Sequence, residues 1–113
     1  MDKVAQYKKL VRQVIEEVAA FFRPGEPVEP QIILDDERGH YLLFSVGWEG
    51  KNWHYASIVH IDVRPDGKVW LQHDGTDLVL ADELVRKGIP KQDIVLGFQS
   101  PVMRQYIEDF AVA

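Results

Sequence analysis

The fold of this chain is decided by residues 40–73, HYLLFSVGWEGKNWHYASIVHIDVRPDGKVWLQH. The stretch is rich in β-branched and aromatic residues, and two groups of polar turn residues interrupt it. In the second group, Asp66-Gly67 supplies residues that accept the positive φ angles of a tight turn. Short connections of this kind favour antiparallel pairing. We therefore predict strands at residues 40–48, 53–63 and 68–73.

The segments before this stretch predict one more strand and a long helix. Residues 31–35 form a short β-rich run, which completes a four-stranded antiparallel meander. Residues 2–22 place apolar side chains at spacings of three and four, the period of an amphipathic helix. Asp2 is the expected N-cap, and Pro24 ends the helix because proline cannot continue it.

After the meander we expect a second helix and a short C-terminal segment. The helix begins at Thr76 or Asp77 and runs to about Lys87, and Gly88 fits the left-handed position that ends it. Residues 94–98 form an apolar run, and a short helix is expected over residues 101–107. The sequence thus predicts a single α+β domain over residues 1–113, with the long helix packed on the meander.

Composition limits the classes of function. The 113 residues carry a formal net charge of -5, which disfavours direct binding to the phosphate backbone of nucleic acids. The chain has no cysteine, so disulfides, thiolate nucleophiles and cysteine-containing zinc sites are excluded. No apolar run approaches the length of a membrane span, and the charged start lacks the core of a signal peptide. We expect a soluble, cytoplasmic protein that binds no membrane.

Side chains alternate along a strand, so each predicted strand contributes to two faces. One face is apolar, and we expect it to pack beneath the long helix. Its members are Ile32, Leu34, Leu42, Phe44, Val46, Trp48, Val59, Ile61, Val63, Val69 and Leu71. The other face is mixed but unusually aromatic. Its members are Ile33, Tyr41, Leu43, Tyr55 or Trp53 depending on a bulge, Ile58, His60, Asp62, Trp70 and Gln72.

Two interpretations of the aromatic face remain open. Aromatic anchors are typical of protein interfaces, so this face could bind another chain through Tyr41, Trp53, Tyr55 and Trp70. Alternatively, the second helix or the run at residues 94–98 covers it from within the same chain, since scattered apolar exposure is common. Both interpretations can hold for different parts of the face.

The best enzymatic candidate is His60-x-Asp62, whose side chains point the same way from one strand. Imidazole and carboxylate groups suit iron, manganese or zinc. The pattern is short and frequent, however, and no HExxH motif or catalytic triad accompanies it, so a simple polar pair is the favoured explanation.

Two further acidic segments have ordinary structural explanations. His73-Asp74-Gly75-Thr76 could offer helix amides to an anion, but Asp74 and Thr76 are themselves preferred capping residues. Adjacent carboxylates at Asp35-Asp36-Glu37 could act as an acid–base pair, but they fit a solvated turn better. We therefore predict no catalytic, cofactor-binding or metal-binding residues and no cofactor.

Longer stretches of the chain resemble one known family, the XisI family. They are residues 36–41, 46–48, 60–62, 69–77 and 88–98, and the likeness extends over essentially the whole chain. The resemblance implies a controlling factor for excision of the fdxN DNA element in cyanobacteria, which acts with XisH and with the recombinase XisF. The family supplies no catalytic residues that could be carried over.

The sequence therefore leads to one principal hypothesis and one rival. In the first, the chain is a non-catalytic regulatory protein whose aromatic face binds an XisH-like protein or a second copy of itself. In the rival, it is a metal-dependent hydrolase or nuclease that uses His60, Asp62, His73 and Asp74.

Overall fold

The computed structural model describes residues 2–112, and Met1 and Ala113 of the predicted domain lie outside the described residues. The elements follow one another as α1 (Lys3–Ala19), β1 (Glu29–Asp35), β2 (His40–Glu49), β3 (Asn52–Val63), β4 (Val69–Asp74), α2 (Leu80–Lys87), the 3₁₀ turn η1 (Lys91–Asp93), β5 (Ile94–Leu96) and α3 (Pro101–Arg104).

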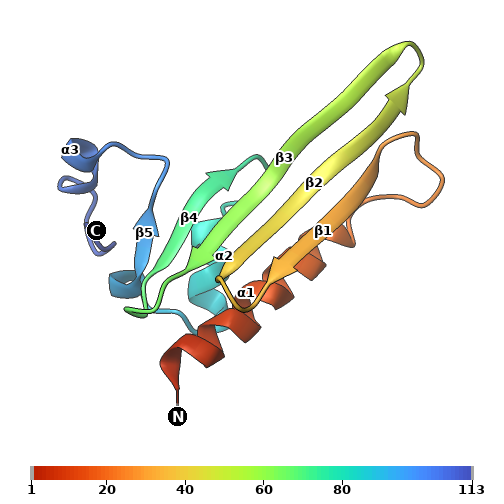
Figure 1. Ribbon diagram of the computed structural model, residues 1–113. Helices are drawn as coiled ribbons and strands as arrows, with labels where there is room; N and C mark the ends of the chain where they lie inside the picture. The colour runs from red at the N-terminus through yellow and green to blue at the C-terminus, as the bar shows by residue number, and fades with distance from the viewer. Residues whose placement is uncertain (1, 113) are drawn as a thin grey trace.

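One sheet organises residues 2–112, with the strand order β1-β2-β3-β4-β5. The first four strands pair antiparallel, as predicted for the meander, and β5 pairs parallel to β4. In Figure 1, α1 and α2 lie along one side of the sheet, and the β2–β3 hairpin extends beyond them. The α+β prediction is confirmed. The apolar run predicted at residues 94–98 supplies the added edge strand, because the connection through α2 returns the chain beside β4.

The long helix forms where its apolar stripe predicts it. Asp2 accepts a hydrogen bond from the amide of Val4 at 3.0 Å and caps α1. The helix ends at Ala19, three residues before the predicted end at residue 22. Its stripe is buried against the sheet through Tyr7, Val11, Val14, Ile15 and Val18. Across residues 2–112, no helix combines the length and the apolar character needed to cross a bilayer.

The buried face of β2 is the opposite of the one predicted. Tyr41, Leu43 and Ser45 are buried, whereas the predicted set of Leu42, Phe44, Val46 and Trp48 lies on the other side of the sheet. Strand β2 carries apolar residues on both faces, so alternation alone could not choose between them. The prediction for β3 and β4 is confirmed, because the side chains of Val59, Ile61, Val63, Val69 and Leu71 are all buried.

The C-terminal part of the chain folds back along the sheet edge. Ser100 caps α3 by accepting a hydrogen bond from Met103 at 3.2 Å, and α3 ends at Arg104, earlier than predicted. The amide of Ala111 donates to the carbonyl of Ile94 at 2.9 Å, and Val95 forms a parallel bridge with Ala111. The segment therefore returns to lie beside β5.

Candidate functional site

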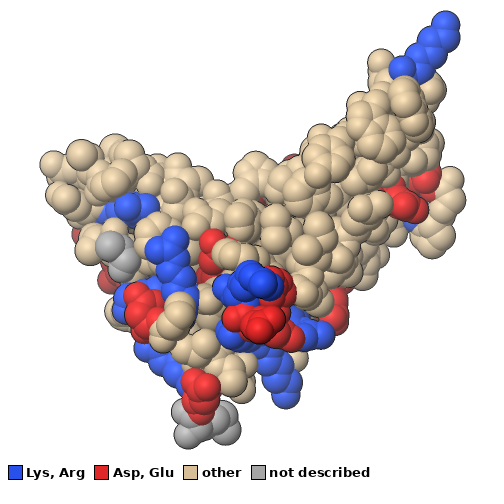
Figure 2. Space-filling view, viewed as in Figure 1, with Lys and Arg blue, Asp and Glu red and all other residues tan. Residues whose placement is uncertain are grey.

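The sheet face that α1 and α2 leave uncovered is the candidate functional site, and we term it the open face. The strand register places its side chains together, running from the hairpin to β4: Trp48, Trp53, Val46, Tyr55, Phe44, Ser57, Leu42, His60, His40, Asp62, Trp70 and Gln72. Figure 2 shows a hollow in the upper outline between the C-terminal segment and the β2–β3 hairpin. Few charged side chains lie along this hollow, and most of those in view gather lower on the molecule.

The hairpin end of the open face is an exposed aromatic cluster. The rings of Trp48 and Trp53 lie 5.4 Å apart, and those of Phe44 and Tyr55 lie 5.2 Å apart. Trp48, Trp53 and Tyr55 are 61%, 53% and 64% exposed. A contiguous group of large exposed rings is typical of a surface that contacts another molecule. Trp53 and Tyr55 both lie here, because the predicted bulge in β3 falls after them, between residues 57 and 59.

The other end of the open face is covered by the chain itself. Trp70 is half-buried, and two guanidinium groups lie close to its ring, that of Arg64 at 3.9 Å and that of Arg104 at 5.2 Å from the ring centre. Arg104 comes from α3, and Val95, which pairs with Trp70 on the neighbouring strand, is fully buried. The aromatic face is thus covered by the chain itself at Trp70, while the rings at the hairpin are left exposed.

A polar cluster lies between these two ends. His40 Nδ1 and His60 Nε2 each lie 2.8 Å from Asp62 Oδ1, and the Gln72 amide donates to Asp62 Oδ2 at 3.2 Å. Burial alone would raise the pKa of Asp62, but hydrogen bonds from His40, Gln72 and His60 and the electrostatic attraction of His60 outweigh it. The pKa of Asp62 is therefore lowered, and its carboxylate stays ionised.

The four residues of the rival enzymatic hypothesis are only partly brought together. His60 and Asp62 are in contact, but His73 Nε2 lies 3.1 Å from the carbonyl oxygen of Ser57. Asp74 accepts hydrogen bonds from the amides of Thr76 and Leu80, both at 3.0 Å. Asp74 therefore caps the loop and the start of α2, as the structural explanation predicted. The helix begins at Leu80, later than the predicted Thr76 or Asp77, because these bonds hold residues 75–79 as a loop.

His40 is the member of the polar cluster that the sequence does not single out. It follows the acidic turn in the chain, but it lies opposite Asp62 in the β2–β3 register. A bulge between Leu43 and Phe44 shifts that register by one residue. Without the bulge, Ile61 would lie opposite His40, so only the three-dimensional pairing identifies this neighbour.

Tyr41 does not lie on the open face, and its predicted placement there is wrong. Its ring is fully buried on the helix side, and its hydroxyl donates to Asp36 Oδ1 at 2.8 Å. Burial, together with the hydrogen bond to Asp36 and its charge, raises the pKa of Tyr41. The side chain therefore anchors the turn at residues 35–39 to the core.

Hydrogen bonds and an ion pair hold the acidic turn in place. Asp35 accepts a hydrogen bond from the backbone of Arg38 at 3.0 Å, which is the main reason its pKa is lowered against a smaller opposing effect of burial. Asp36 pairs with Arg12 of α1 and accepts the hydrogen bond from Tyr41. These contacts agree with the solvated-turn explanation.

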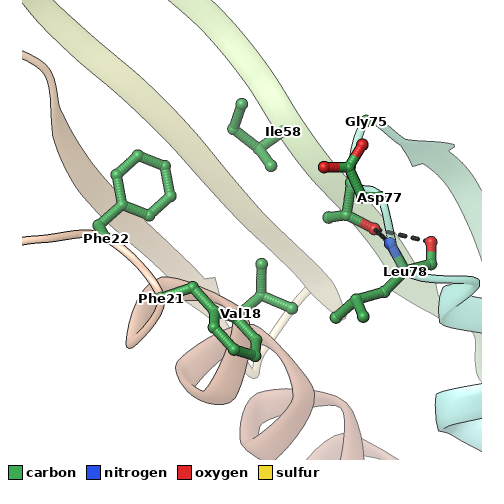
Figure 3. A pocket seen from close by; sticks show the side chains of 8 residues that line it. Val18, Phe21, Phe22, Ile58, Gly75, Asp77 and Leu78 are labelled. Atoms are coloured by element: carbon green, nitrogen blue, oxygen red, sulfur yellow. Dashed lines mark hydrogen bonds between the residues drawn. The ribbon is translucent and has the colours of Figure 1, made fainter.

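A second hollow lies on the helix side of the sheet. It is an open groove of ≈ 470 Å³ between the end of α1, the bulge residue Ile58 and the loop at residues 75–78. Figure 3 shows Phe21, Phe22 and Val18 on one side of it and Leu78 on the other. Phe21 is 72% exposed. No local pattern in the sequence indicates this groove, because its walls come from three distant segments.

Comparison with known proteins gives a consistent result. The family model described as XisI protein matches residues 1–112. A crystal structure of a XisI-like protein from Anabaena variabilis ATCC 29413 is similar with a TM-score of 0.90 and 44% identity, over 97% of this chain and 99% of that chain.

A second crystal structure, of the fdxN element excision controlling factor XisI from the same organism, is also similar. Its TM-score is 0.84 and its identity 32%, over 99% of this chain and 100% of that chain. A search of curated proteins gives no significant match.

Proposed function

The chain belongs to the XisI family, and from this membership we propose that it is a non-catalytic accessory factor that controls excision of a DNA element by binding a protein partner. One solved relative is described as an fdxN element excision controlling factor, and this description supports the proposed process. The partner we propose is an XisH-like protein, and the cytoplasm is the proposed place of action.

The exposed rings at the hairpin end of the open face carry the proposal. The side chains of Trp48, Trp53 and Tyr55 are each more than half exposed. Trp48 packs against Trp53, and Tyr55 packs against Phe44. Burying rings of this size on a partner would stabilise a complex substantially, because aromatic anchors dominate many interface energies. The charge of -5 further supports a protein partner over direct contact with DNA.

The rival hydrolase or nuclease has less support. Two of its four proposed residues, His73 and Asp74, bond to the backbone of β3 and to the start of α2. An active site on this sheet would have to work without them.

The test is the binding of an XisH-like protein to Trp53→Glu and Tyr55→Glu variants, measured by isothermal titration calorimetry. We expect each substitution to weaken binding at least tenfold, because a charged side chain at an aromatic anchor opposes desolvation. Phe21→Glu is the matched control, since Phe21 is also an exposed aromatic residue but lies on the helix side.

Circular dichroism would verify that each variant folds. Equal affinity of Trp53→Glu, Tyr55→Glu and the unmodified chain would refute the proposed surface. Light scattering of the chain alone would show whether the same rings instead join two copies, in which case Trp53→Glu would convert a dimer to a monomer.

A further inference from the structure

Three donor atoms converge at the centre of the open face. One ring nitrogen of His40, one of His60 and an Asp62 carboxylate oxygen all lie within 4.8 Å of one another. His40 and Asp62 are directly opposite each other on β2 and β3, and His60 precedes Asp62 by two residues on the same strand. Because paired strands fix the backbone positions of all three residues, the fold itself brings their side chains to one place on the open face.

We propose that His40, His60 and Asp62 form a binding site for one divalent transition-metal ion of the zinc class. Two imidazoles and a carboxylate are ligands that zinc and neighbouring metals accept. A tetrahedral centre with bonds of about 2.0–2.1 Å separates its donors by about 3.3 Å. The present separations of 2.8 Å from each ring nitrogen to Asp62 Oδ1 are within a small side-chain movement of that geometry.

The charge of Asp62 is available to a cation. Among residues 2–112, the ion pairs of Asp62 are with His40 and His60 alone, and no lysine or arginine neutralises it. The nearby guanidinium of Arg64 lies over the ring of Trp70 instead. Asp93, by contrast, has Lys3 and Lys68 beside it.

The surroundings of the cluster also suit a metal site. Gln72 donates to Asp62 Oδ2 and so orients the carboxylate with Oδ1 toward the two histidines. Supporting bonds of this kind orient ligands and typically change metal affinity about 10–100-fold. His40 is exposed and His60 half-buried, so the remaining coordination positions face solvent or a docked chain.

A plain hydrogen-bonded network is the competing explanation, and the two differ in where the ring protons lie. In the network, His40 carries its proton on Nδ1 and His60 on Nε2, since both nitrogens donate to Asp62 Oδ1. A bound metal takes these two nitrogens, so the protons move to His40 Nε2 and His60 Nδ1.

The chain has four histidines, which permits a complete set of matched variants. Chelator-treated full-length protein would be titrated with zinc chloride in a calorimeter. We expect one ion per chain with a micromolar or lower dissociation constant. His40→Gln and His60→Gln should each weaken zinc binding at least tenfold, while His54→Gln and His73→Gln leave it unchanged, because His54 bonds to Ser45 and His73 to the backbone of Ser57.

Nitrogen-15 spectra of the imidazole rings provide a second readout that does not depend on affinity. Zinc should move the proton from Nδ1 to Nε2 in His40 and from Nε2 to Nδ1 in His60, and should leave His54 and His73 unaltered. Failure of the unmodified chain to take up zinc would overturn the proposal. Equal weakening in all four variants, or loss confined to His73→Gln, would do so as well. The measurement needs no partner protein, so its result is independent of the proposed docking function.

Discussion

At the scale of single residues, Asp93 shows how buried charge is accommodated in this fold. Its carboxylate accepts a hydrogen bond from the hydroxyl of Tyr7, and it lies 3.1 Å from Lys3 Nζ and 3.6 Å from Lys68 Nζ. Burial would raise the pKa of Asp93, but the bonds from Tyr7 and Lys3 and the two lysine charges outweigh it. Burial and the same contact raise the pKa of Tyr7 to about 12.

We expect Asp93→Asn to lower the free energy of unfolding at pH 7 by about 1–3 kcal/mol, because Tyr7, Lys3 and Lys68 lose a charged partner. The folded-state pKa of Asp93 is lowered, so its contribution is present above the unfolded-state pKa and is lost as pH falls through the folded-state value. Urea denaturation would measure the free energy of unfolding at pH 7 and near pH 3. The decrease from pH 7 to pH 3 should be smaller for Asp93→Asn than for the unmodified chain. Asp77→Asn, at an exposed position, is the control and should behave as the unmodified chain.

At the scale of elements, the β2–β3 hairpin depends on its bulge. Near the turn, Glu49 pairs with Asn52 and Phe44 with Ser57, but beyond the bulge Leu43 pairs with Val59 and His40 with Asp62. The extra residue, Ile58, changes which parity of β3 faces α1. As a result, Trp53 and Tyr55 share the open face with His60 and Asp62.

Adjacent leucines on β2 test this assignment. Leu43→Ala should lower the free energy of unfolding by about 2–5 kcal/mol, because Leu43 is fully buried beneath α1 and its removal leaves a cavity. Leu42→Ala should cost less than half as much, since Leu42 is half-buried on the open face. Guanidinium denaturation of the two variants provides the comparison. A larger loss for Leu42→Ala would restore the face assignment predicted from the sequence.

At the scale of the whole molecule, the two ends of the open face differ in how far the chain itself covers them. The C-terminal segment returns beside β5, and the β2–β3 hairpin extends past the helices (Figure 1). Val95 of β5 is fully buried, whereas Trp48, Trp53 and Tyr55 of the hairpin are exposed. The hollow between these two parts is the feature that a docking chain would meet. The C-terminal segment thus fixes the boundary of the surface that we propose for partner binding.

Removal of residues 100–113 tests the covering role of this segment. We expect the free energy of unfolding to fall by about 2–4 kcal/mol, because Val95 and part of Trp70 lose their cover. In a background with Trp48 and Trp53 replaced by phenylalanine, acrylamide quenching of Trp70 fluorescence should increase. Unchanged quenching would mean that Arg104 and its neighbours do not shield Trp70 in solution.

The sequence by itself determined which segments form helices and strands, the α+β class and the family resemblance. These follow from local periodicity, capping and turn residues, which depend on backbone geometry over a few positions. It also placed Trp70 on the aromatic face and left the choice between Tyr55 and Trp53 to a bulge in residues 53–63, which the structure locates at Ile58.

Only the tertiary structure decided which face of β2 is buried, that His40 joins His60 and Asp62, and that β5 extends the sheet. Tyr41 and Leu42 are both apolar enough for a core, so the choice between them depends on the residues across the sheet. That register is shifted by a bulge, and the cover over Trp70 comes from a distant segment. Contacts of this kind depend on how the whole chain packs, and that packing joins residues too far apart in the sequence for a local pattern to relate them.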